Sequence, residues 1–137
     1  MTLRFAHAMI QVRNLNESIS FYRRALNLVV VERHEYDGAS LAYLRAPEGG
    51  AELELLSEQP WAYAQHPEKG RSHIAFTTVS LEAEHARLTA LGLSPGPITP
   101  HHANGKLQTR FFYFYDPEGN EIEILEAIGR YKQEADS

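Results

Sequence analysis

The two halves of this chain carry nearly the same segment. APEGGAELELL at residues 46–56 returns as DPEGNEIEIL at residues 116–125, with one residue of slippage at the turn. The alignment that pairs these segments matches Glu54 with Glu123 and, near the start of each half, His7 with His73. Internal duplication indicates one structural unit formed twice, so the fold is expected to consist of two similar modules.

The first half predicts one helix among four strands. In FAHAMIQV, residues 5–12, the side chains alternate as expected for a strand. Residues 14–26 have apolar residues at helical spacing, and Asn14 or Asn16 can cap this helix. Three further strands, separated by turn residues such as Asp37 and Gly38, are predicted at 28–36, 40–46 and 51–56. The order is therefore βαβββ.

The second half predicts the same order. A strand at 72–79 precedes a helical segment, SLEAEHARLTALG, which Ser80 can cap and Gly92 can end. A loop at 94–106 follows, with a short strand near 97–99 needed to complete the pattern, and residues 108–125 read as a strand, a turn and a last strand. The predicted fold class is α+β: two βαβββ modules, at about 5–57 and 71–127, forming a curved mixed sheet with the helices on its outer face.

Composition limits the class of protein. At 137 residues with 43% hydrophobic content, the chain has the size of one domain with a core, and residues 129–137 form a polar tail. The absence of cysteine excludes disulfides and thiolate ligands and favours the cytoplasm. A net charge of −5, without basic clusters or a long apolar run, argues against nucleic acid or membrane as the partner and favours a small molecule.

Strand alternation places the matched polar residues on one kind of face. His7 is on the opposite face from the small aliphatic residues of its strand, which suit packing against a helix. Leu53 and Leu55 likewise leave Glu54 facing away from the helix. In the last strand, Glu123 has the same relation to its isoleucine neighbours, and His73 is the counterpart of His7 in the alignment. If the sheet curls, these side chains line a pocket.

A set of two histidines and two glutamates suits a divalent metal ion. Such nitrogen and oxygen ligands fit Ni, Co, Zn, Mn or Fe(II) better than Ca or Mg. A single glutamate on a strand is more often solvated, and a single histidine is more often hydrogen-bonded than a ligand. The coincidence of all four in one alignment favours a metal site formed by His7, Glu54, His73 and Glu123.

These motifs resemble a known superfamily. FAHAMIQVRNLNESISFYRRALNL, with LELL, SHIAF and DPEGNEIEIL, looks like the vicinal oxygen chelate superfamily, which comprises glyoxalases, bleomycin resistance proteins and extradiol dioxygenases, and is most similar to glyoxalase I. The similarity covers about residues 5–127. It implies paired βαβββ modules, the four metal ligands named above at the matching positions, and a homodimer, in which modules of two subunits share a site.

The resemblance to glyoxalase I implies a metal-dependent lyase or isomerase of the lactoylglutathione lyase type, with metal-bound enediolate chemistry on a substrate that has vicinal oxygens. Glu123 is the expected catalytic base, with Glu54 as its partner across the metal. Gln11 and Ser57 depart from the pattern of the glutathione-dependent enzymes, so glutathione is only a candidate co-substrate. The candidate substrate contacts are Arg13, Trp61, Lys106 and Arg110.

Two other functions fit the same superfamily. An extradiol dioxygenase would use His7, His73 and Glu123 as a triad on Fe(II), with His101 or His102 in the loop for proton transfer. Glu54 would then occupy a position that the dioxygenase needs free. A drug-binding protein of the bleomycin-resistance type would instead line a groove with aromatic residues, and such members generally lack the metal set.

Overall fold

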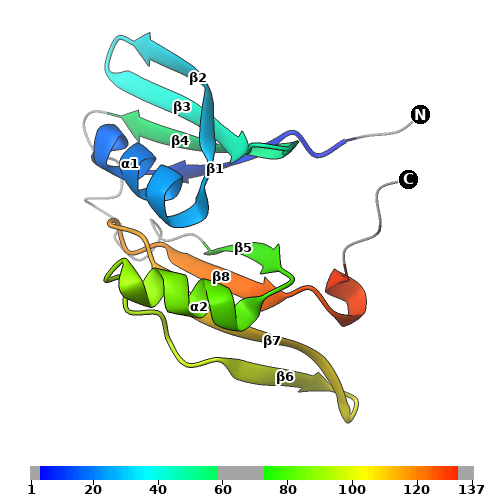
Figure 1. Cartoon of the computed structure of the whole chain (residues 1–137). Coiled ribbons are helices and arrows are strands. Elements are labelled where there is room, and N and C mark those ends of the chain that lie inside the picture. The colour runs from blue at the N-terminus through cyan, green and yellow to red at the C-terminus, as the bar shows by residue number, and fades with distance from the viewer. Residues whose placement is uncertain (1–3, 59–72, 133–137) are drawn as a thin grey trace. The chain divides into compact units, whose positions relative to one another are not determined.

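The computed structural model describes residues 4–58 and 73–132 (Figure 1). The chain divides into two compact units. The first unit contains residues 1–72 together with the turn at 116–119, and the second contains residues 73–115 and 120–137. Among the described residues, each unit has one sheet and one α-helix, so the duplication in the sequence is also a duplication of structure.

The first unit has the order βαβββ. Its elements are β1 (His7–Gln11), α1 (Leu15–Leu26), β2 (Val29–Tyr36), β3 (Ala39–Ala46) and β4 (Gly49–Glu58). The four strands form a mixed sheet in the order β1-β4-β3-β2. β1 runs parallel to β4, and the other neighbours are antiparallel. The first strand therefore lies beside the last strand of its module, which brings residues far apart in the sequence into register.

Local sequence explains where α1 begins and ends. The side-chain Oδ1 of Asn14 accepts the backbone N–H of Glu17 at 3.0 Å, which satisfies one of the free donors of the first turn. Asn27 follows the helix in the left-handed region, with φ of 55°, and asparagine tolerates this conformation better than most residues. The buried face of α1 packs against β3 and β4. Of the two predicted caps, Asn14 is the one used.

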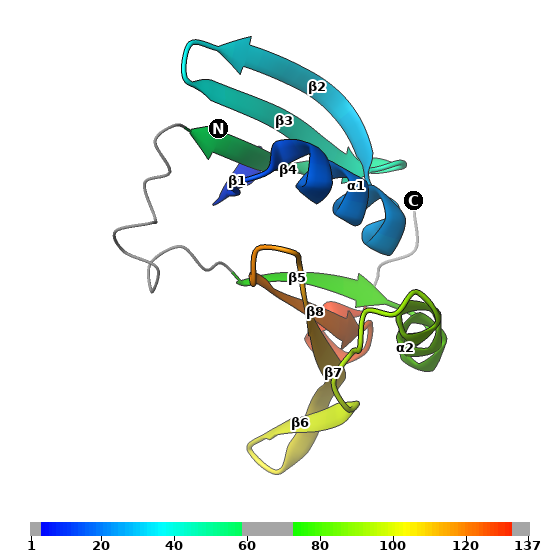
Figure 2. The ribbon, with the colours of Figure 1, turned by 90° about the vertical axis from the view of Figure 1, so that its left-hand side faces the viewer.

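The second unit repeats this arrangement. Its elements are β5 (His73–Thr78), α2 (Leu81–Ala90), β6 (Thr99–Ala103), β7 (Lys106–Tyr115), β8 (Glu121–Glu126) and a 3-10 helix at Gly129–Tyr131. The strand order is β5-β8-β7-β6, with β5 parallel to β8 (Figure 2). The predicted α+β class and the βαβββ order of both halves are confirmed.

One predicted strand was misplaced. The short strand expected near residues 97–99 is β6 at Thr99–Ala103, so His101 and His102 lie on a strand and not in a loop. The physical reason is the Asn104-Gly105 dipeptide, in which both residues have positive φ, 54° and 73°. This pair forms the tight turn that best matches the twist of a hairpin, so β6 must end just before it and pair with β7.

Helix α2 differs in detail from its prediction. Ser80 occupies the N-cap position, but its side chain makes no capping hydrogen bond; its backbone N–H donates to Thr78 Oγ1 at 3.1 Å. The helix ends at Ala90, and Gly92 follows with φ of 79°. The predicted polar tail from residue 129 begins with an ordered 3-10 turn, Gly129–Tyr131.

The core of each unit lies between its helix and one face of its sheet. In the second unit, α2 contacts β7 and β8. The fully buried side chains on these three elements include Leu81, Leu88, Phe112, Phe114 and Ile122. Because side chains alternate along a strand, the residues between these positions point to the other face. No described helix has the length and apolar character needed to cross a membrane.

Candidate functional site

His7 and Glu54 form a pair on the sheet of the first unit. Glu54 lies next to Met9 in the parallel register of β1 and β4, two residues after Glu52, which is the register partner of His7. His7 Nε2 is 3.2 Å from Glu54 Oε1, and the glutamate side chain is only 13% exposed, against 42% for the histidine. A partly buried carboxylate is thus held beside an accessible imidazole.

His73 and Glu123 form the matching pair in the second unit. Glu123 lies next to Ala75 in the register of β5 and β8, the same offset as in the first unit. His73 Nε2 is 3.2 Å from Glu123 Oε1, with side-chain exposures of 49% and 15%. The equal distances and nearly equal exposures show that the duplication preserves the local geometry of the pair as well as its residue types.

Each pair also has a tyrosine. Tyr43 lies next to Glu54 in the register of β3 and β4, and Tyr113 lies next to Glu123 in that of β7 and β8. The ring centroids of Tyr43 and His7 are 5.4 Å apart, and those of Tyr113 and His73 are 5.8 Å apart, both edge to face. Each unit therefore brings together a histidine, a glutamate and a tyrosine.

Sequence reasoning missed these tyrosines, although the duplication holds the signal. AYLRAP at 42–47 and FYFYDP at 112–117 each place a tyrosine four residues before the proline of the repeated turn (47 − 43 and 117 − 113). An alignment extended upstream of the turn pairs Tyr43 with Tyr113.

Burial changes the acid–base properties of the two tyrosines. Loss of hydration raises the pKa of Tyr113 to about 12, and a hydrogen bond to Glu123 and the charge of that carboxylate add to the effect. Burial, followed by the charge of Glu54, also raises the pKa of Tyr43. Both phenols therefore stay protonated at neutral pH. Tyr113 is a hydrogen-bond donor beside Glu123, the carboxylate that the resemblance to glyoxalase I implies as the catalytic base.

We expect Tyr113→Phe to change how stability depends on alkaline pH. The pKa of Tyr113 is raised from 10.0 to about 12, so its contribution to stability is full below about pH 10 and is lost as the pH rises toward 12. Urea unfolding at pH 8 to 11.5 is therefore expected to show a shallower alkaline loss for Tyr113→Phe than for the wild type. Tyr115→Phe, which changes a 57% exposed tyrosine on the same strand, is the control. Identical alkaline slopes for Tyr113→Phe and wild type would contradict the assignment.

The donor atoms of each pair suit a shared cation. Neighbouring ligand atoms about 2.1 Å from one cation lie roughly 3.0 Å apart in an octahedron and roughly 3.4 Å apart in a tetrahedron. The observed 3.2 Å between imidazole nitrogen and carboxylate oxygen lies in this range in both units. The same separation also allows a direct hydrogen bond. Among residues 4–58 and 73–132, no group of three or more potential ligands is gathered for a metal.

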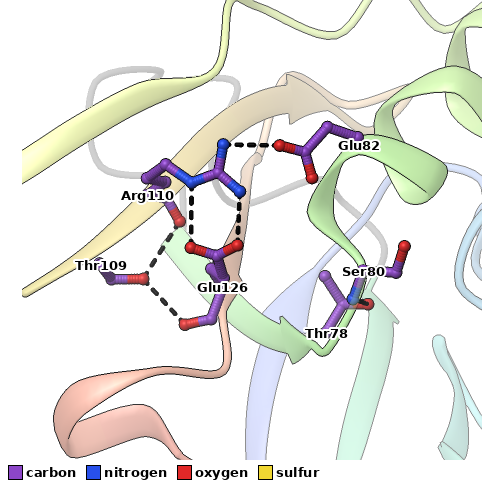
Figure 3. Close-up of polar contacts among 6 residues, drawn as sticks. All are labelled: Thr78, Ser80, Glu82, Thr109, Arg110 and Glu126. Atoms are coloured by element: carbon purple, nitrogen blue, oxygen red, sulfur yellow. Dashed lines mark hydrogen bonds and ion pairs between the residues drawn. The ribbon is translucent and has the colours of Figure 1, made fainter.

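Arg110, a predicted substrate contact, is engaged within the second unit (Figure 3). Its guanidinium binds both oxygens of Glu126, at 3.0 and 2.5 Å, and Glu82 Oε1 at 2.6 Å. The hydrogen bond to Glu126, and then the one to Glu82, raise the pKa of Arg110. The same bonds lower the pKa of both Glu126 and Glu82. On β7, Arg110 is on the same face of the sheet as Phe112 and on the opposite face from Tyr113. This is the face that α2 covers. The contacts of Arg110 join α2 to β7 and β8.

The other predicted contacts are placed as follows. The backbone N–H of Arg13 donates to Glu118 Oε2 at 2.9 Å, and its carbonyl accepts the hydroxyl of Ser57 at 3.0 Å. Lys106 is exposed at the start of β7. Trp61 lies outside the described residues. His101 and His102 are exposed on β6, where the register with β7 shifts between them.

The sequence and the fold are similar to those of known proteins. A family model described as the glyoxalase/bleomycin resistance protein/dioxygenase superfamily matches residues 4–124. The protein YwbC of Bacillus subtilis (strain 168) is 31% identical over 131 residues, which cover 92% of this chain and 99% of YwbC.

Two solved structures show how widely the fold is used. The trypanothione-dependent glyoxalase I of Leishmania major is 26% identical, with a TM-score of 0.68 over 91% of this chain and 87% of its own. TnmS3, an antibiotic-binding protein of Streptomyces sp. CB03234, is 17% identical, with a TM-score of 0.73 over 91% of this chain and 96% of its own, a likeness of fold alone. With the family match over most of its length and the duplicated βαβββ units, the chain belongs to the glyoxalase/bleomycin resistance protein/dioxygenase superfamily.

Proposed function

We propose that this protein is a metal-dependent enzyme of the glyoxalase I type, a lyase or isomerase acting on a small substrate with vicinal oxygens. The observation that carries the proposal is the pair of equivalent half-sites, His7 with Glu54 and His73 with Glu123, each with 3.2 Å between its donor atoms. A chain that only sequesters a ligand has no need of two matched imidazole–carboxylate pairs. Their donor atoms are the ligand types that a first-row divalent metal prefers.

As the superfamily resemblance implies, the two pairs together would supply two nitrogen and two oxygen ligands for one cation. This donor set fits Ni, Co, Zn, Mn or Fe(II). When bound, the metal ion would act as a Lewis acid toward two neighbouring substrate oxygens. The four ligands would come from one chain or from two copies of it, and we propose a homodimer, as the superfamily resemblance implies. The one feature required of the substrate is a pair of adjacent oxygen atoms.

The residues of the chain account for the proton transfer. Glu123 would take a proton from the sulfur-bearing carbon of a hemithioacetal and return it to the neighbouring carbon, while the hydroxyl proton passes to the neighbouring oxygen. The product is a hydroxyacyl thioester, formed without an oxidant or reductant. Its side chain is 15% exposed, so little water competes for its oxygens. The protonated phenol of Tyr113 would hold the carboxylate in place during the transfer, and Glu54 has the corresponding place in the other half-site.

Support for glutathione as the thiol is weaker than support for the reaction type. Gln11, whose amide donates to Glu58 Oε1 at 3.1 Å, stands where the resemblance leads one to expect arginine. Ser57, which binds the carbonyl of Arg13, stands near the place of an expected asparagine. Arg110, a candidate for holding a thiol's carboxylates, is bound to Glu126 and Glu82. Glutathione and other thiols should therefore be assayed side by side.

The proposal is tested by measuring metal content and metal affinity. Protein from its own host is expected to contain Ni, Co, Zn, Mn or Fe(II), to isomerise hemithioacetals and to consume no oxygen. His7→Ala and His73→Ala are each expected to lower metal affinity by more than about 100-fold, beyond the range of outer-shell changes. His34→Ala is the matched control, since His34 is a partly exposed histidine of the same sheet as His7, beside Glu32.

Other results would point to the rival functions. Iron together with oxygen uptake on catechols would replace the proposal with ring cleavage by a dioxygenase. Stoichiometric binding of an antibiotic by metal-free protein, without turnover, would replace it with sequestration. Unchanged metal affinity in both histidine variants would exclude the two half-sites as the metal ligands.

A further inference from the structure

His73 is held at both nitrogens of its ring. Nδ1 lies 2.9 Å from Glu121 Oε1, and Nε2 lies 3.2 Å from Glu123 Oε1. The two carboxylates are on the same strand, β8, two positions apart, so both point to the same face of the sheet. They reach opposite sides of the imidazole, and this fixes the orientation of the ring more firmly than either contact alone.

The strand register produces this arrangement. His73 lies directly opposite Glu121 in the parallel pairing of β5 and β8, whereas Glu123 lies opposite Ala75. On the neighbouring strand, Tyr115 lies opposite Glu121, and its hydroxyl is 3.4 Å from the second carboxylate oxygen, Oε2. Glu121 is thus placed between a phenol on one side and the Nδ1 of His73 on the other.

The first unit has the same residue types without the same contact. Glu52 lies opposite His7 in the register of β1 and β4, as Glu121 lies opposite His73. Within the described part of the chain, His7 pairs with Glu54 and packs against Tyr43, and its ring makes no hydrogen bond or ion pair with Glu52. The duplicated positions have therefore diverged in geometry, and Glu52 offers a matched control for Glu121.

We propose that Glu121 is a positioning residue for His73. Its carboxylate accepts the Nδ1–H of the imidazole, which leaves the lone pair of Nε2 directed toward Glu123, where a metal ion would bind. A ring N–H bound to a carboxylate sets the tautomer of a ligating histidine and raises its strength as a ligand. This role rests on the proposed function, because it concerns the metal ion of that same site.

The geometry separates this role from that of a ligand. Glu121 contacts Nδ1 and Glu123 contacts Nε2, and the Nδ1–H bond and the Nε2 lone pair point away from each other. A cation between Nε2 and Glu123 is therefore on the far side of the ring from the carboxylate of Glu121. Glu121 acts on the metal only through His73.

Zinc titration of the full-length protein, followed by calorimetry, tests the role. Glu121→Ala is expected to weaken zinc binding about 10- to 100-fold, the range for the loss of an outer partner of a ligating histidine. Glu121→Gln keeps an acceptor oxygen and is expected to restore a large part of the affinity. Glu52→Ala is expected to bind zinc as the wild type does. Thermal unfolding of the metal-free variants checks that all of them are folded.

A second readout reports the ring directly. In long-range ¹H–¹⁵N spectra of the zinc-loaded protein, His73 is expected to show a protonated Nδ1 in slow exchange and a metal-bound Nε2. Glu121→Ala is expected to lose the slow exchange of that proton, and Glu52→Ala to keep it. A general loss of stability would not single out one ring proton in this way.

The possible outcomes separate this inference from the proposed function. If the wild type binds zinc and Glu121→Ala weakens binding no more than Glu52→Ala, the positioning role is overturned and the metal site stands. If Nδ1 of His73 is the metal-bound nitrogen, the role is overturned as well. If the wild type binds none of the five candidate metals, the proposed function fails, and the role of Glu121 fails with it.

Discussion

Glu123→Gln is expected to retain a bound metal ion while losing turnover by about 10²- to 10⁴-fold, the range over which a positioned general base contributes. The amide keeps an oxygen near His73 Nε2, which lies 3.2 Å from the native carboxylate, but it cannot accept the substrate proton. Steady-state kinetics with a hemithioacetal, together with metal analysis of the same sample, measure the two properties separately. The expected pattern is a loss in kcat with the metal content preserved.

Glu48→Gln is the control for this experiment. It makes the same chemical change at an exposed position in the turn between β3 and β4, and it should leave kcat unchanged. Full activity in Glu123→Gln would remove Glu123 as the base. Complete loss of metal would contradict the expected retention and would show that the carboxylate is needed first as a ligand.

Tyr22→Phe is expected to lower the free energy of unfolding by about 1.5–3 kcal/mol, the range for a hydrogen bond to a charged group. The phenol of Tyr22, on α1, is fully buried and donates to Asp116 Oδ2 at 2.7 Å. Burial, reinforced by the charge of Asp116, raises the pKa of Tyr22, so the group is a protonated donor at neutral pH. Phenylalanine fills nearly the same space and removes only the donor.

Urea unfolding at neutral pH measures this effect, with Tyr36→Phe as the control. Tyr36 belongs to the same unit and is 60% exposed, so its hydroxyl is expected to matter little. The Asp116 turn also holds Glu118, whose carboxylate accepts the backbone N–H groups of Arg13 and Asn14 at 2.9 and 3.2 Å. Equal stability of Tyr22→Phe and Tyr36→Phe would show that the buried hydrogen bond contributes no more than one to water.

Much of the fold could be predicted from local pattern and repetition. The alternation in FAHAMIQV, the helical spacing after it and the PEG turns indicated βαβββ in both halves, and the structure has this order. Alternation also separated His7 from Ile10, and Glu54 from Leu53 and Leu55, and these three aliphatic residues are buried. The misplaced strand β6 is the exception. Its end is set by the Asn104-Gly105 turn, in which both residues have positive φ.

The candidate site was only partly predictable, for a physical reason. The direction of a side chain along a strand is a local property, but the residue it lies beside depends on which strands pair and in what register. The contacts of His73 with Glu121 and of Tyr113 with Glu123 arise because β8 lies between β5 and β7. The engagement of Arg110 by Glu126 and Glu82 likewise needs β7, β8 and α2 together.

The sequence by itself determined the repeated unit, its order of elements, the superfamily resemblance and the residue types available for chemistry, because these depend on periodicity and on the similarity of two segments. Only the tertiary structure decided that Tyr43 and Tyr113 join the histidine–glutamate pairs, that Glu121 and not Glu52 holds a histidine ring, and that Arg110 is bound within its own unit. Hydrogen bonds act over about 3 Å, and only the pairing of distant strands brings these atoms that close.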